Sequence, residues 1–98
     1  MKKKYAFLLM GEHYDPEVHR CRFETARDIV LLRTVRDFAE AKAVAVELKD
    51  DGVGAMEVCG AFGPEKTAEL VALTGGEVAV GYVVHDPALD GVFARFFG

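Results

Sequence analysis

The sequence is poor in cysteine, in positive charge and in long apolar runs, and each shortage argues against a class of protein. Two cysteines, Cys21 and Cys59, are too few for a disulfide scaffold. A formal net charge of -4 argues against a nucleic-acid binder, because such proteins are normally basic. The apolar run Tyr5–Met10 is too short for a signal-peptide core or a membrane span. We therefore expect free thiols, no membrane contact and a cytoplasmic location.

What the chain does have is a high share of apolar residues for its length. Its 98 residues predict a single domain over 1–98. Apolar residues make up 51% of them, although a domain of this size buries only about 60–65% of its unfolded surface. We expect a homo-oligomer, in which a second copy covers the excess.

Apolar segments alternate with helical patterns along the whole chain. Four strands are predicted, at Tyr5–Met10, Asp28–Val35, Ala55–Cys59 and Glu77–His85. Helices are predicted between and after them, from Pro16 to about Cys21, from Asp37 to Gly52, from Pro64 to about Leu73, and from Pro87 onward. The first strand is apolar at every position, which is typical of a strand buried on both faces.

The boundaries of the second predicted helix carry the clearest local signals. Asp37 and Glu40 have the spacing of a capping box, and Gly52 is a typical helix end. Alternation of strands and helices predicts an α/β fold, a single small domain with an open, mostly parallel four-stranded sheet, β-α repeats and flanking helices. In such a sheet the carboxyl ends of the strands meet at one edge, where ligands bind.

Four candidate catalytic residues follow from this arrangement. Glu57 lies inside an apolar strand, so it is either a general base or ligand anchor, or a structural carboxylate paired with Arg33 or a backbone amide. Cys59 is a candidate nucleophile, with His85 or His13 as its base, but cysteine is also a common small buried residue. His85 and His13 are equally candidate acid–base partners, or histidines that bond only to nearby backbone.

The turn after Cys59 is a candidate anion seat. Gly60, Phe62 and Gly63 precede Pro64, which opens a helix, and free amides at a helix start bind anions. A tight turn explains the same residues without a ligand. Arg33, near the end of its strand, is the candidate anion contact. No pair of metal-ligand residues has a diagnostic spacing, so no metal site is predicted.

The C-terminal part of the sequence predicts a contact between subunits. Ala79 and Gly81 place small residues on one face of the last strand, which allows close approach of another element. Apolar residues recur at helical spacing in the last helix, at Leu89, Val92, Phe93 and Phe96. We expect the small residues of the last strand, together with Phe93, Phe96 and Phe97, to be buried between copies of the chain.

Three functions remain open at this point. The first is binding of a small anionic metabolite at the carboxyl edge, with lyase, isomerase or hydrolase chemistry and no identified cofactor. The second is a non-catalytic binding or regulatory module with the same pocket. The third is an oligomeric interaction protein that uses its apolar C-terminal helix. A pocket at the sheet edge would separate the first two from the third, and a loss of turnover in Glu57→Gln or Cys59→Ser would separate the first from the second.

Several segments carry a resemblance to a known family. They read LLMG, DPEVHR, GVGAMEVCGAFG, GYVVHDP and FARFFG, and CGAFG and GYVVH are the most specific. Together they resemble a small, uncharacterised prokaryotic family of chains about as long as this one, a domain of unknown function. The resemblance implies no activity. The strand with its CG end is also similar to units of (β/α)-barrel enzymes, an analogy of fold alone.

Overall fold

The computed structural model describes residues 1–98 and contains one five-stranded sheet. Its strands are β1 (Lys3–Met10), β2 (Cys21–Glu24), β3 (Asp28–Val35), β4 (Ala55–Val58) and β5 (Ala79–Tyr82), in the spatial order β2-β3-β1-β4-β5. β2 pairs with β3 in antiparallel fashion, and every other pair is parallel. The predicted α/β fold with a mostly parallel sheet is therefore confirmed.

Three α-helices and one short 3-10 helix accompany the sheet. They are α1 (Phe38–Asp50), α2 (Gly63–Leu73), η1 (Pro87–Leu89) and α3 (Asp90–Phe97). Half of the predicted capping box forms at the start of α1, because Asp37 Oδ1 accepts a hydrogen bond from the Glu40 amide at 2.9 Å. The Glu40 side chain reaches one residue further back than predicted, and accepts from the Arg36 amide at 2.7 Å. Gly52 follows the end of α1 with φ +95°, a conformation that glycine adopts easily.

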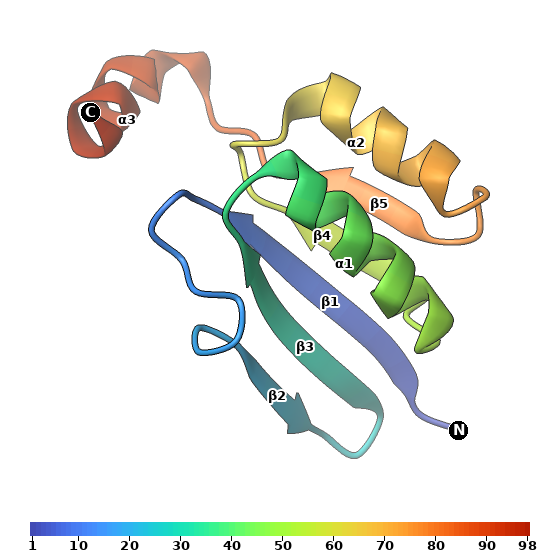
Figure 1. Cartoon of the computed structure of the whole chain (residues 1–98). Helices are drawn as coiled ribbons and strands as arrows, with labels where there is room; N and C mark the ends of the chain where they lie inside the picture. Colours follow the sequence, from blue (N-terminus) through green and yellow to red (C-terminus); the bar gives the residue numbers. More distant parts are fainter.

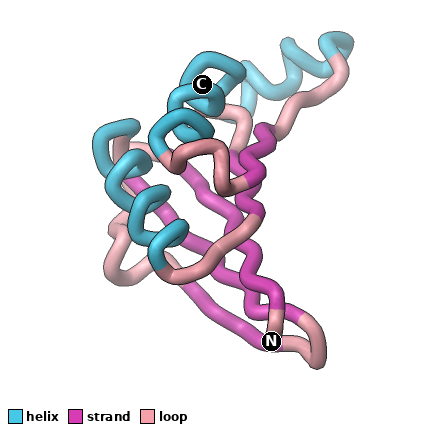
Figure 2. Tube along the Cα trace, turned by 90° about the vertical axis from the view of Figure 1, so that its right-hand side faces the viewer, coloured by secondary structure: helices cyan, strands magenta, loops and turns pink.

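Both long helices lie on the same face of the sheet. In Figure 1, α1 and α2 run side by side in front of the strands, and Figure 2 shows them together on one side of the strands. α1 packs on β1 and β3, and α2 packs on β5. Between helices and sheet lies a core of buried apolar side chains: Ala6, Leu8, Leu31, Val35, Ala41, Ala45, Leu48, Val53, Met56, Val58, Phe62, Leu70 and Val78.

No helix covers the opposite face of the sheet (Figure 2). Side chains alternate along β1, so Ala6 and Leu8 are fully buried while Tyr5, Phe7 and Leu9 are only half-buried. The prediction that this strand is buried on both faces is therefore wrong for the single chain. Two crossover helices that lie on one side leave the other side open.

The strand count and one helix differ from the prediction. The chain has five strands rather than four, and the segment from Pro16 to Cys21 is not a helix. Val18 and His19 both donate backbone hydrogen bonds to the Asp15 carbonyl, at 3.1 and 2.8 Å, which closes a single turn. The chain then enters β2, whose four residues are all exposed. Its residues alternate between apolar and charged types, but a strand of four residues is too short for this alternation to identify it.

The C-terminal helix is separated from the rest of the molecule. Figure 1 shows α3 beyond the carboxyl ends of β4 and β5, away from α1 and α2. Its main contacts are with η1, and none of its residues is buried. β5 is also shorter than the predicted Glu77–His85 segment, so the chain from Val83 onward leads out to this helix.

Candidate functional site

The carboxyl ends of β1 and β4 are joined through Cys59. Its amide donates to the Leu8 carbonyl at 3.1 Å, and its sulfur accepts a hydrogen bond from the Met10 amide at 3.4 Å. A Cβ added at Gly60 would lie 3.6 Å from the Val83 carbonyl oxygen, so β5 also ends close by. Cys59 is a half-buried free thiol whose two hydrogen bonds connect the end of β4 to the end of β1.

Glu57 lies on the uncovered side of the sheet, where it pairs with Tyr5. Tyr5 Oη donates to Glu57 Oε1 at 2.7 Å. Burial of the phenol, together with this hydrogen bond and the nearby charge, raises the pKa of Tyr5 to about 12. Glu57 itself is exposed, so it is not a buried carboxylate, and its partner is neither Arg33 nor a backbone amide. Tyr5 was not among the predicted site residues, because strand register cannot be read from a single sequence.

Arg33 lies on the opposite side of the sheet, beneath α1. Its side chain is only 8% exposed and forms an ion pair with Glu47 of α1. Its Nε atom is buried without a hydrogen-bond partner. Arg33 and Glu57 are thus separated by the sheet itself, and the arginine ties α1 to β3.

The two candidate acid–base histidines lie in separate loops. His13 is almost fully exposed, with Nε2 3.2 Å from Glu12 Oε1. His85 Nε2 is 2.6 Å from Asp90 Oδ1, and its ring stacks on Phe93 with the ring centroids 3.9 Å apart. In this structure His85 contacts the start and middle of α3 and connects the helix to the chain that follows β5.

The predicted anion seat is a tight turn that leads into α2. The Phe62 amide donates to the Cys59 carbonyl at 3.1 Å, and Gly63 has φ +69°. Phe62 is buried and packs edge-on against Phe38, with ring centroids 6.3 Å apart. Phe62 therefore belongs to the core, whereas Gly60 and the first turn of α2 remain near the surface.

The predicted residues thus fall into several groups rather than one. Cys59 and Gly60 lie at the carboxyl edge, Glu57 on the uncovered face, Arg33 and Phe62 under the helices, and each histidine in its own loop. No group of three or more histidine, cysteine, aspartate or glutamate residues is arranged to hold a metal ion. The chain by itself does not assemble these side chains into one catalytic centre.

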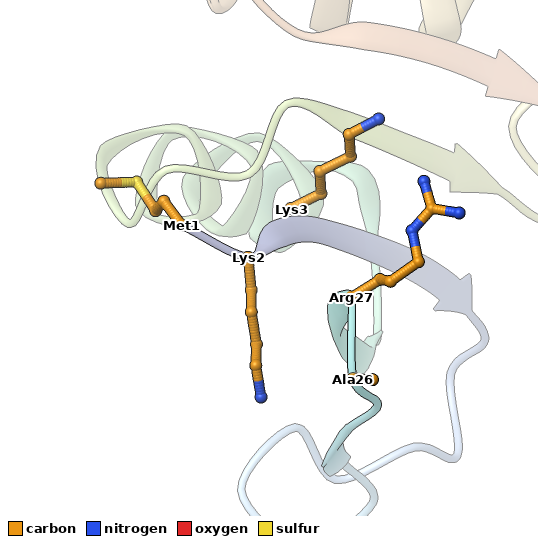
Figure 3. Close-up of a pocket in the computed structure, with 5 residues that line it drawn as sticks. All are labelled: Met1, Lys2, Lys3, Ala26 and Arg27. Atoms are coloured by element: carbon orange, nitrogen blue, oxygen red, sulfur yellow. The ribbon is translucent and has the colours of Figure 1, made fainter.

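Two hollows lie at the amino ends of the strands, at the far end of the sheet from Cys59. One of about 460 Å³ is lined by residues that include Lys4, Tyr5 and Gly54. The other, of about 350 Å³, is lined by Met1, Lys2, Lys3, Ala26 and Arg27. Figure 3 shows Lys3 and Arg27 extending to the same side and Lys2 to the opposite side, so the basic groups do not converge on one point.

The uncovered face is the largest feature that sequence reasoning missed. We use this name for the residues that alternation and register place opposite the helices, apart from Lys3 and Asp28 at its amino end: Cys21, Phe23, Val30, Leu32, Thr34, Tyr5, Phe7, Leu9, Ala55, Glu57, Ala79 and Gly81. Phe23 and the three large residues of β1 make it mainly apolar. Glu57 is the one charged side chain in its middle.

Comparison with known proteins places the chain in a family without transferring a function. No curated protein and no solved structure matches it. None of its helices combines the length and the apolar character that crossing a membrane requires. Residues 3–98 match the family model described as "Family of unknown function (DUF6506)", so this chain, with its half-covered sheet and separate C-terminal helix, belongs to that family.

Proposed function

We propose that this protein is a self-associating interaction protein, a homo-oligomer whose copies pack together through the uncovered face. The observation that supports this proposal is that β1 is apolar on both faces but is covered by helices on only one. Every residue from Tyr5 to Met10 is apolar, a pattern that belongs to strands covered on both sides. A single chain supplies helices on one side only, and a second copy supplies the missing layer.

The exposed area of the chain supports the same conclusion. The molecule exposes 6435 Å². A folded monomer of 10.7 kDa is expected to expose about 5500 Å². The excess of roughly 900 Å² is close to the ~800 Å² that each partner buries in a standard protein interface. The separate α3 and the uncovered sheet account for this excess.

The composition of the uncovered face suits an interface between identical copies. Interface cores are depleted of charged residues and enriched in aromatic ones. Tyr5, Phe7 and Phe23 supply aromatic surface, and Lys3 and Asp28 lie only at the amino end of the strands. Two sheets that pack face to face approach to about 10 Å, so side chains of this size fill the space between them.

The oligomeric state tests this proposal directly. Sedimentation equilibrium of the full chain should give about twice the mass of one copy or more. Phe7→Glu places a charge in the middle of the uncovered face and should shift the protein to monomer. Val46→Glu, on the exposed surface of α1, is the matched control and should leave the mass unchanged. A wild-type protein that stays monomeric up to millimolar concentration would contradict the proposal.

A second candidate function is binding of a small anionic metabolite at the carboxyl edge. One observation favours it: α2 begins at Gly63 without a side-chain cap, so the amides of its first turn have no side-chain partner, although Pro64 contributes no N–H. Cys59 is the nearest side chain with chemical reactivity. Thermal shift with inorganic phosphate and small carboxylates tests this candidate. A rise in Tm that Gly60→Val abolishes supports it, and no shift with any of these anions argues against it.

We also propose that the protein is cytoplasmic. Cys21 is exposed and Cys59 is half-buried, and neither has a disulfide partner within the chain. Free thiols persist in reducing compartments. Cell fractionation that found the protein outside the cytoplasm would contradict this placement.

A further inference from the structure

We propose that α3 is an exchanged arm, and that it docks on the β4–β5 part of the uncovered face of a second copy. This inference rests on the proposed self-association and names the element that each copy contributes. It divides the uncovered face in two. The large side chains of β2, β3 and β1 meet the partner's sheet, and the small side chains of β4 and β5 receive the partner's helix.

The helix itself needs a surface that its own chain does not provide. Phe96 and Phe97 are 82% and 79% exposed. The stripe of Leu89, Val92, Phe93 and Phe96 predicted from the sequence is exposed along its length, and its only ring contact outside α3 is the stacking of Phe93 on His85. An isolated helix of eight residues is unstable in water, so stable helix formation here requires tertiary contacts.

The segment between β5 and α3 directs the helix away from its own sheet. The contacts of His85 with Asp90 and with Phe93 fix the start of the helix beyond the carboxyl edge. Figure 1 shows the resulting separation of α3 from the domain. Docking on its own sheet would require these contacts to break, whereas a second copy can approach the helix where it stands.

The receiving surface is formed largely by small residues. Ala55 and Ala79 lie side by side on β4 and β5, and Gly81 lies beside Glu57. A Cβ at Gly81 would approach only the Glu57 side chain, at 4.0 Å, so the space above it is open. Small residues let a helix approach a sheet closely, and the β1 residues beside them, Tyr5 and Phe7, are larger.

Charge complementarity supports the same pairing. Arg95 is the only basic residue of α3, flanks the apolar stripe, and has no ion-pair partner within the chain. Glu57 is the only acidic residue in the middle of the receiving surface. Its Oε1 accepts from Tyr5, and its Oε2 has no hydrogen-bond partner within the chain. The Arg95 guanidinium of a second copy would donate a hydrogen bond to Oε2 and form an ion pair with this carboxylate.

A charge exchange tests the pairing in the full-length protein. Arg95→Glu and Glu57→Arg should each weaken self-association about tenfold, measured by sedimentation equilibrium. Combined in one chain, the two substitutions should restore most of the wild-type affinity. Lys66→Glu, on the exposed surface of α2, is the control and should have no effect. Weakening by both single variants without recovery in the double variant would overturn the pairing.

A cross-linking experiment separates this inference from self-association itself. A chain carrying Phe96→Cys is mixed with a chain carrying Ala79→Cys, both with Cys21→Ser and Cys59→Ser. Mild oxidation should give a disulfide between the two chains. Oligomers that form without this disulfide overturn the docking of the arm and leave the proposed function standing. A protein that stays monomeric overturns both proposals.

Discussion

Neighbouring residues of β1 meet two different surroundings. Ala6 and Leu8 are fully buried beneath the helices, whereas Tyr5, Phe7 and Leu9, between and beside them, are half-buried on the other side. The two sets are equally apolar, so composition does not distinguish the faces. What distinguishes them is which side the connecting helices cover. A strand can therefore be apolar on both faces while its own chain covers only one of them. The apolar face that remains uncovered indicates where a partner would bind.

The largest expected effect contrasts Leu8 with Leu9. Leu8→Ala removes a fully buried side chain and should lower the free energy of unfolding by about 2–5 kcal/mol at every protein concentration. Leu9→Ala should cost less than about 1 kcal/mol in dilute protein and more as the copies associate. Urea denaturation at several concentrations measures both. Equal, concentration-independent losses would mean that the two faces are equally covered.

A smaller effect is expected from the ion pair on the covered side. Glu47→Ala leaves the buried Arg33 guanidinium without its carboxylate and should lower the free energy of unfolding by about 1–3 kcal/mol. Glu69→Ala, on the exposed surface of α2, is the control and should change it by no more than about 0.5 kcal/mol. Chemical denaturation compares the two. A loss no larger than that of the control would show that Arg33 finds another partner.

Two helix caps distinguish the domain from the arm. Asp37→Ala removes the side-chain cap of α1 and should cost about 1 kcal/mol of domain stability. Asp86 makes the equivalent bond to the Ala88 amide at the start of η1. Asp86→Ala should leave the stability of the separated monomer unchanged, because α3 barely contacts the domain. A thermal unfolding series in dilute protein tests this, and a shared loss would show that the arm is part of the domain.

The smallest effect concerns the polar pair on the uncovered face. The pKa of Tyr5 is raised in the folded protein from about 10 to about 12, so folding favours the protonated phenol. The resulting stability is complete below pH 10 and is lost as the pH rises from 10 to 12. Tyr5→Phe should flatten this part of the stability curve. An unchanged alkaline slope in the variant would show that Tyr5 does not cause it.

The parts predicted correctly from the sequence are those with strong local signals. The capping box at Asp37 marks α1, Pro64 marks the start of α2, and apolar runs mark β1, β3 and β4. β2 gave only a weak signal, because its alternation of apolar and charged residues covers four positions. For this reason four strands were predicted, whereas the chain has five.

The candidate site was harder to predict, because it depended on strand order and register. Arg33 and Glu57 both lie in predicted strands, and nothing local shows that the sheet separates them. The partnership of Tyr5 and Glu57 joins residues 52 positions apart, through the pairing of β1 with β4. Periodicity assigns a residue to an element, whereas neighbours across a sheet follow only from the assembled topology.

β2 also explains why the molecule has only two layers. In doubly wound proteins, a helix carries the chain from the first strand to its parallel neighbour on the side opposite the later helices. Here the chain returns from β1 to β3 through β2, within the plane of the sheet. The helix that was expected at Pro16–Cys21 is absent for the same reason that the second layer is absent: β2 occupies this part of the chain. With a four-residue strand in place of a covering helix, one face of the sheet stays exposed and is available to another molecule.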